Sequence, residues 1–198
     1  MNQRNPVWEE KVVASLRESA EVKLRVAQEL ARPIVQVAEA IVSRLAKGGK
    51  VVFFGNGGSA ADAQHLAAEL IGRFQGERKA LPAIALTTDT SILTAIGNDY
   101  TFDQVFERQV EGLVGPCDAV IGISTSGCSI NVLKGLKKAK DCGALTVAFL
   151  GKKGGEIREV VDFPLVFPSD HTSHIQESHI AIGHILCRLI EEGLGVHG

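Results

Sequence analysis

Residues 51–72 constrain the fold more than any other stretch of the sequence. They begin with the apolar run VVFF, pass through the glycine-rich turn GNGGS, and continue as a segment with helical periodicity. A short run of β-branched and aromatic residues is typical of a strand buried on both faces of a parallel sheet. The stretch therefore predicts a buried strand, a tight turn and a helix in direct succession.

The turn at residues 55–59 is a candidate anion-binding site. Gly57 and Gly58 permit positive φ and close approach of a ligand, and Ser59 is expected to cap the helix. Backbone N–H groups at a helix N-terminus favour negative charge, so a phosphate or sugar oxygen fits beside Asn56. The turn matches neither the Walker P-loop nor the GxGxxG spacing. From the turn alone, ligand binding and a purely structural connection both remain open.

The predicted helix carries three polar residues at a spacing of four: His65, Glu69 and Arg73. Residues four apart lie on one helix face, one turn from each other, so these side chains are expected to form a ridge. An ordinary solvated face with i,i+4 pairs is the alternative interpretation. The candidate anion site at the start of the same helix favours a function.

The rest of the chain alternates apolar runs with segments of helical periodicity. This alternation predicts an α/β fold with a five-stranded, mainly parallel sheet flanked by helices on both faces. Pro33 separates two amphipathic segments and predicts two N-terminal helices rather than one. No repeat or linker is present, so we expect a single domain over residues 1–198, in which residues 1–47 form a helical extension. The further strands are expected at residues 83–86, 119–124, 145–150 and 163–167.

Ligands of such sheets bind at the carboxyl ends of the strands, where this sequence places hydroxyl side chains. Four hydroxyls within six residues exceed what helix capping requires, and they predict a second anion-binding loop: Ser124, Thr125, Ser126 and Ser129. Asn98 and Asp99 lie between helical segments. An ordinary turn and a ligand contact are both open for them.

The last predicted helix, at about residues 172–194, carries Gln176 and His184. They are eight residues apart, about 80° around the helix axis, so both can face one cleft. A single histidine on such a helix is more often a packed core residue. The pair gains weight as a site only together with His65 and Glu69.

Composition limits the partners. The net charge is −2 and no basic tract is present, which argues against nucleic-acid and anionic-membrane binding. The four cysteines lack disulfide or zinc-finger spacing, and no signal peptide or membrane-spanning run is recognisable. The sequence therefore predicts a cytoplasmic protein whose partners are small molecules or protein.

Four separated motifs carry a family resemblance: GNGGSAADAQHLAAELIGR, GNDYTFDQVF, ISTSGCSINV and IQESHIAIGHIL. Together, over about residues 10–195, they resemble the phosphoheptose isomerase family, whose members have the sugar isomerase (SIS) fold. The resemblance implies conversion of D-sedoheptulose 7-phosphate to D-glycero-D-manno-heptose 7-phosphate, the first step of nucleotide-activated heptose biosynthesis. It also implies a homotetramer that contains one Zn²⁺ per subunit.

Carried onto this chain, the resemblance implies specific site residues. The zinc ligands are His65, Glu69, Gln176 and His184. The substrate contacts that the resemblance implies are Asn56, Gly57, Gly58, Asn98, Asp99, Ser124, Thr125, Ser126, Ser129 and Gln176. To these we add Ser59 from the glycine turn and Glu69 and Arg73 from the helix ridge. The sequence departs from the family pattern at Cys128, where asparagine is usual, and at His174, where arginine is common. The second change puts in doubt a cationic contact to the phosphate.

An aldose–ketose isomerisation needs a base, an acid and stabilisation of a developing oxyanion. Glu69 is expected to act as the base and His184 as its acid/base partner. Direct zinc ligation by Glu69 competes with this use, and that choice is open. The resemblance also extends to non-catalytic SIS-fold adaptors that bind the bacterial replication initiator protein, which lack these two proton-transfer groups. A sugar-phosphate-sensing transcription regulator would need a separate DNA-binding domain, which the sequence lacks.

Overall fold

A five-stranded sheet, parallel throughout, forms the centre of the molecule. The computed structural model describes residues 5–195, so residues 1–4 and 196–198 of the expected domain lie outside it. In the order β2-β1-β3-β4-β5, the strands are β2 (Ala83–Ala85), β1 (Val51–Gly55), β3 (Ala119–Ser124), β4 (Leu145–Leu150) and β5 (Phe163–Val166). The expected fold class and all five strand positions are confirmed.

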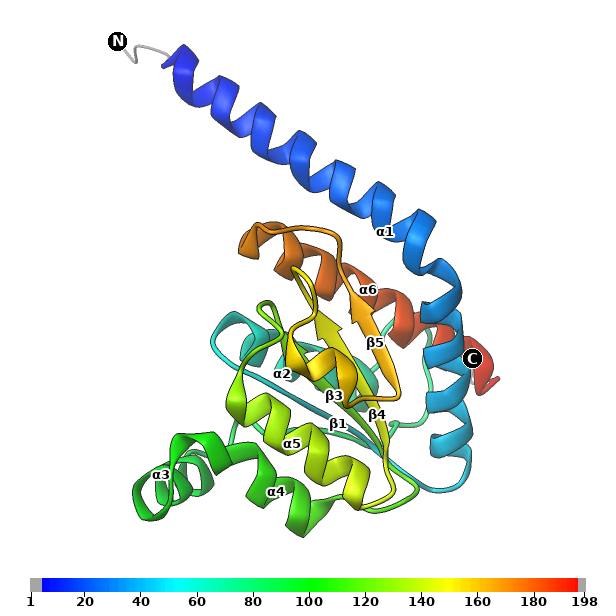
Figure 1. Cartoon of the computed structure of the whole chain (residues 1–198). Helices are drawn as coiled ribbons and strands as arrows, with labels where there is room; N and C mark the ends of the chain where they lie inside the picture. Colours follow the sequence, from blue (N-terminus) through cyan, green and yellow to red (C-terminus); the bar gives the residue numbers. More distant parts are fainter. Residues whose placement is uncertain (1–4, 196–198) are drawn as a thin grey trace.

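Helices cover both faces of the sheet (Figure 1). One face packs against α1 (Pro6–Ala46), α2 (Gly58–Ile71) and α6 (Thr172–Gly193). The other packs against α3 (Thr90–Asp99), α4 (Val105–Leu113) and α5 (Ile130–Asp141). Two short 3₁₀ helices, η1 (Phe102–Gln104) and η2 (Glu156–Glu159), complete the connections.

The alternation of side chains along β1 explains why its sequence is apolar throughout. Phe53 packs into the core on the α1, α2 and α6 side, whereas Val52 and Phe54 pack into the core on the opposite side. All five residues of β1 are buried. A strand covered by helices on both faces has no position for a polar side chain.

The expectation of two N-terminal helices was wrong, because α1 is one helix of 41 residues with Pro33 inside it. A proline within a helix removes one hydrogen bond and costs about 3 kcal/mol. The next turns bury Ile34, Val37 and Ile41 to 4% exposure or less, and each such side chain contributes about 1.5–3 kcal/mol. This burial outweighs the cost of the proline. The helix continues and changes direction along its length, as Figure 1 shows, instead of ending.

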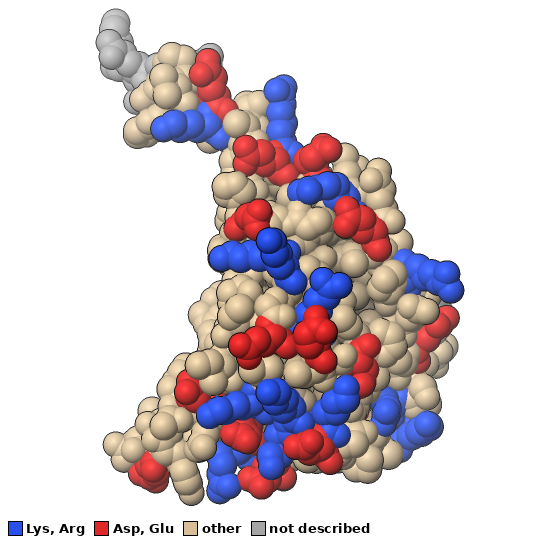
Figure 2. Space-filling model, in the orientation of Figure 1, with Lys and Arg blue, Asp and Glu red and all other residues tan. Residues whose placement is uncertain are grey.

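The two ends of α1 have different surroundings. The C-terminal part packs against the sheet and α6. Residues 5–18 are all exposed, and Figure 2 shows this end extending beyond the rest of the molecule. Within residues 5–195, no helix is both long enough and apolar enough to cross a lipid bilayer.

Candidate active site

The crevice between the ends of β1 and β3 is the point where the chain changes direction in the sheet. These neighbouring strands lead into helices on opposite faces, α2 after β1 and α5 after β3. Ligands of open α/β sheets bind at such switch points. Asn56 and Asn131 bridge the two connections with reciprocal amide hydrogen bonds of 2.8 Å.

The glycine turn has the backbone conformation that its sequence predicts. Gly57 has φ +55° and occupies the N-cap position, and α2 begins at Gly58. The expected cap by Ser59 was wrong, because Ser59 is the second residue of the helix, is buried, and makes no capping bond. Glycine at the cap leaves the first N–H groups of α2 without a side-chain acceptor from the N-cap residue, as an anion-binding helix end requires.

The hydroxyl loop after β3 is held together by its own side chains. Ser124 Oγ lies 3.0 Å from Ser129 Oγ and 3.4 Å from Ser126 Oγ, and it accepts the N–H of Gly127. Ser129 occupies the N-cap position of α5 but makes no side-chain capping bond. Capping therefore does not account for these hydroxyls. Together with Thr125, they lie at the same edge of the sheet as the glycine turn.

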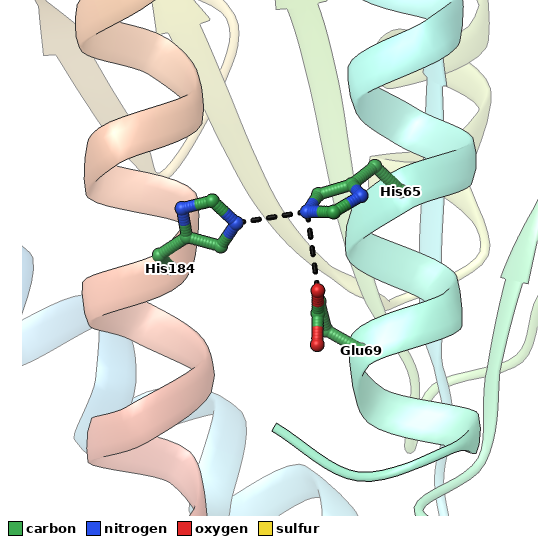
Figure 3. Close-up of side chains that lie close together, drawn as sticks. All are labelled: His65, Glu69 and His184. Carbon is green, nitrogen blue, oxygen red and sulfur yellow. Dashed lines mark hydrogen bonds and ion pairs between the residues drawn. The ribbon is translucent and has the colours of Figure 1, made fainter. Parts of the chain in front are cut away.

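A cluster of two histidines and a glutamate lies between α2 and α6 (Figure 3). His65 Nε2 is 3.1 Å from Glu69 Oε1 and 2.8 Å from His184 Nε2. The His65–Glu69 pair follows from the i,i+4 spacing on α2. The contact with His184 follows from close helix packing at Gly183, where a Cβ would meet Leu66 of α2. The structure thus confirms that these three predicted residues converge.

The donor atoms of this cluster suit a metal ion. Two imidazole nitrogens and a carboxylate oxygen lie within 4.8 Å of one another. Ligand bonds of about 2.0–2.2 Å in a tetrahedral zinc site place donor atoms about 3.3 Å apart. The separations of 2.8 and 3.1 Å in the cluster are close to that value. His65, Glu69 and His184 are therefore a possible metal site, and their donor set fits zinc.

The side-chain amide of Gln176, a residue of α6, lies at the start of α2. A Cβ on Gly58 would clash with the Gln176 amide, so glycine at this position makes room for it. Burial raises the pKa of Asp62, while a hydrogen bond from Gln176 and the nearby His65 partly oppose this shift. Asp62 Oδ2 is buried and has no hydrogen-bond partner within the described part of the chain.

Three predicted site residues lie elsewhere than expected. Arg73 is not on the α2 ridge, because the helix ends at Ile71; its exposed side chain lies 3.7 Å from Glu77. Asn98 and Asp99 form the last turn of α3 rather than a turn between helices, and Asn98 Nδ2 donates to Asp99 Oδ1.

The surroundings of His174 differ from those of the His65, Glu69 and His184 cluster. It is buried near α1, with Nε2 3.4 Å from Ser15 Oγ. The structure does not bring it to the His65, Glu69 and His184 cluster.

Sequence reasoning missed three residues next to the site. Asp62 could have been found, because Gly58, Asp62, His65 and Glu69 follow helical spacing along one face. Asn131 lies within the ISTSGCSINV motif, but its pairing with Asn56 requires the sheet order. Phe74, whose ring stacks on His184 at a centroid distance of 5.5 Å, follows the helix end and carries no periodic signal.

Comparisons with known proteins define the class of protein first. The family model described as the SIS domain matches residues 16–151, so this is a SIS-domain protein. The chain is 60% identical over 183 residues to the phosphoheptose isomerase of Aquifex aeolicus, covering 92% of this chain and 96% of that protein.

Solved structures agree with the sequence comparison. The phosphoheptose isomerase GmhA of Neisseria gonorrhoeae has a TM-score of 0.89 and 44% identity, covering 93% of this chain and 99% of that one. A phosphoheptose isomerase of Francisella tularensis has a TM-score of 0.90 and 40% identity, covering 92% and 97%. The chain belongs to the phosphoheptose isomerase family.

Proposed function

We propose that the chain is a sugar-phosphate isomerase that converts D-sedoheptulose 7-phosphate to D-glycero-D-manno-heptose 7-phosphate in heptose biosynthesis. The observation that carries this proposal is the convergence of His65, Glu69 and His184 between α2 and α6, in a chain that belongs to the phosphoheptose isomerase family. The adaptor alternative requires no proton-transfer groups, whereas this chain contains two candidates, Glu69 and His184. The reaction is an intramolecular oxidation and reduction, in which a proton moves between C1 and C2 through an enediol.

Glu69 is the proposed base. Its Oε1 faces His65, which leaves Oε2 as the atom that takes the substrate proton. The Nε2 atoms of His65 and His184 are 2.8 Å apart, so one is the hydrogen-bond donor and the other the acceptor. Without a metal ion the two imidazoles can therefore share a proton, and His184 is the proposed group that exchanges a proton with the sugar oxygens. Each proton-transfer group contributes about 10²–10⁴-fold to the rate.

Zinc is the proposed metal, with His65, Glu69, His184 and Gln176 as its ligands. The bound ion would polarise the sugar oxygens. Glu69 serves either as a ligand throughout turnover or as a base that leaves the ion. Comparing activity with metal content distinguishes these two roles.

The phosphate-binding groups are assigned to the two loops of the crevice. The N–H groups at the start of α2 and the hydroxyl loop, Ser124, Thr125, Ser126 and Ser129, offer donors for an anion. Asn56, Gly57, Gly58 and Ser59 border the sugar. Arg73, Asn98 and Asp99 are exposed on separate segments, so their contribution requires movement or a neighbouring subunit.

The test is an assay of the purified protein with sedoheptulose 7-phosphate, followed by NMR for a new aldose phosphate, before and after treatment with a chelator. We expect turnover in the untreated protein and its loss with the metal. Restoration by zinc would support the ligand set. A zinc-loaded protein that leaves the ketose unchanged would contradict the isomerase assignment.

The exposed N-terminal end of α1, residues 6–18, is the proposed subunit contact of a homotetramer. In this proposal the chain is one SIS domain, and residues 1–47 are its oligomerisation extension. Large apolar side chains exposed within residues 6–18 are Val7, Trp8, Val12, Val13 and Leu16. Burying each contributes about 1.5–3 kcal/mol, which favours packing against other copies.

Substitution tests this contact better than deletion of residues 1–30, because that deletion would also remove the buried Val22 and Val26. We expect the double variant Val12→Asp, Leu16→Asp to be a smaller species by light scattering. An unchanged mass would contradict the assigned contact.

A further inference from the structure

A buried ion pair fixes the segment that follows α2. The side chains of Arg78 and Glu191 are 1% and 5% exposed, and Arg78 Nε lies 2.5 Å from Glu191 Oε1. Glu191 also accepts the N–H groups of Phe74 and Gln75, at 3.0 and 3.3 Å. Burial raises the pKa of Glu191, but the hydrogen bonds from Phe74, Arg78 and Gln75 outweigh it and lower the pKa below its ordinary value. Glu191 is therefore a charged anchor for the backbone of Phe74.

The same arginine binds the end of α2. Arg78 donates to the carbonyl oxygens of Glu69 and Leu70, both at 2.9 Å. A cation at a helix C-terminus satisfies carbonyls that lack partners within the helix. Arg78 thus connects the turn of α2 that carries Glu69 to the turn of α6 that carries Glu191. Glu191 lies two helical turns after His184 in α6.

In the described part of the chain, the His184 ring makes no hydrogen bond to a carboxylate or carbonyl oxygen. The ring of a functional histidine is generally fixed by a hydrogen bond from its second nitrogen to a carboxylate or carbonyl. Within residues 5–195, the His184 ring has one hydrogen-bonding partner, His65 Nε2. One face of the ring lies against Phe74 instead, with an interplanar angle of 10°. Aromatic stacking of this kind contributes orientation as well as buried area.

We propose that Phe74 is a positioning residue for His184, and that the Arg78–Glu191 pair fixes Phe74 in place. The stacked ring fixes the imidazole plane so that Nε2 points at His65 and Glu69. This role rests on the proposed function of His184, but it concerns the geometry of the ring before any substrate binds.

The test compares Phe74→Leu, which removes the ring, with Phe74→Tyr, which retains it. Phe163→Leu is the matched control, because Phe163 is another half-buried phenylalanine that packs against the same core. It begins β5, the edge strand opposite β2. For Phe74→Leu we expect kcat to fall about tenfold with KM within about twofold, and zinc affinity to weaken about tenfold. Phe74→Tyr and Phe163→Leu are expected to stay within about twofold of the parent.

NMR of the metal-free protein gives a readout that does not depend on turnover, and the measurement on the parent does not depend on whether a variant folds. A stacked Phe74 shifts the His184 ring protons upfield, and Phe74→Leu removes that shift. Isomerase activity of the parent tests the proposed function separately. The positioning role is overturned if the parent lacks the upfield shift, if folded Phe74→Leu retains kcat and zinc affinity, or if Phe163→Leu loses as much of both.

Discussion

The two sides of α6 carry histidines in opposite environments. His184 faces α2 and is partly exposed beside His65 and Glu69. His179, five residues earlier and about 140° around the axis, is fully buried against Phe149 and Phe167, with ring centroids 5.7 and 4.5 Å away. Burial lowers the pKa of His179 to about 4, and a backbone contact with Leu150 offsets only part of that shift.

This contrast shows that surroundings, rather than residue type or helix position, decide which histidine is available for chemistry. Among the described residues, the ring nitrogens of His179 have no hydrogen-bond partner of good geometry, so the ring stays neutral at pH 7. His184 has a polar partner, His65 Nε2, and is partly exposed to solvent. One side of α6 is therefore expected to carry function and the other stability.

The largest effect is expected on the α2-facing side. His184→Asn and Glu69→Gln each remove a proton-transferring group while retaining similar volume, so kcat should fall about 10²–10⁴-fold. Thermal unfolding should remain close to that of the parent, and His171→Asn, at the exposed start of α6, is the control. Substantial turnover in both variants would refute the acid/base assignment and favour the adaptor alternative.

The buried side should affect stability through pH. The pKa of folded His179 is about 4, below its ordinary value of 6.5, so the unfolded chain takes up the proton first as pH falls. The neutral His179 ring therefore contributes fully to the free energy of unfolding above about pH 6.5. This contribution falls by about 3 kcal/mol as the pH decreases toward 4. Denaturant unfolding across this range measures it.

Replacement of the buried ring separates this effect from the acid titration of carboxylates. His179→Phe should flatten the pH dependence between pH 6.5 and 4 and keep activity within about twofold of the parent. A variant whose stability follows the parent curve would show that His179 is not the group responsible. Loss of activity without loss of folding would erase the distinction between the two sides of α6.

A smaller effect is expected where α6 meets the glycine turn. In Gly58→Ala, the added methyl displaces the flexible Gln176 amide, so metal affinity should weaken about tenfold with little change in unfolding temperature. Gly112→Ala in α4 is the control, because its methyl would meet nothing within 4 Å and only helix propensity changes. Unchanged metal affinity in Gly58→Ala would remove Gln176 from the ligand set.

The sheet was predictable because its strands are apolar on both faces and are separated by helical periodicity. Local patterns failed where tertiary packing outweighed them. Pro33 marks a helix end by local rules, but the buried side chains that follow it retain the helix. Gly97, Asn98 and Asp99 have turn composition, yet they complete the last turn of α3.

The candidate site was predictable where helical spacing defines it. His65 and Glu69 pair because they are four residues apart, and Gln176 and His184 share a face of α6. Extending the same spacing to Arg73 failed, because the helix ends before it. The Arg78–Glu191 pair and the stacking of Phe74 join segments more than 100 residues apart, which no local pattern encodes.

The packing of α1 against α6 brings the first and last helices of the chain together in one core. A ribosome therefore releases the sheet before it releases the element that completes both that core and the His65–His184 contact. Contacts between such distant parts of a chain form slowly, because loop closure precedes any gain from burial. A product of premature termination between residues 167 and 183 would contain all five strands but lack His184 and thus the complete cluster, so activity is expected to report completed synthesis.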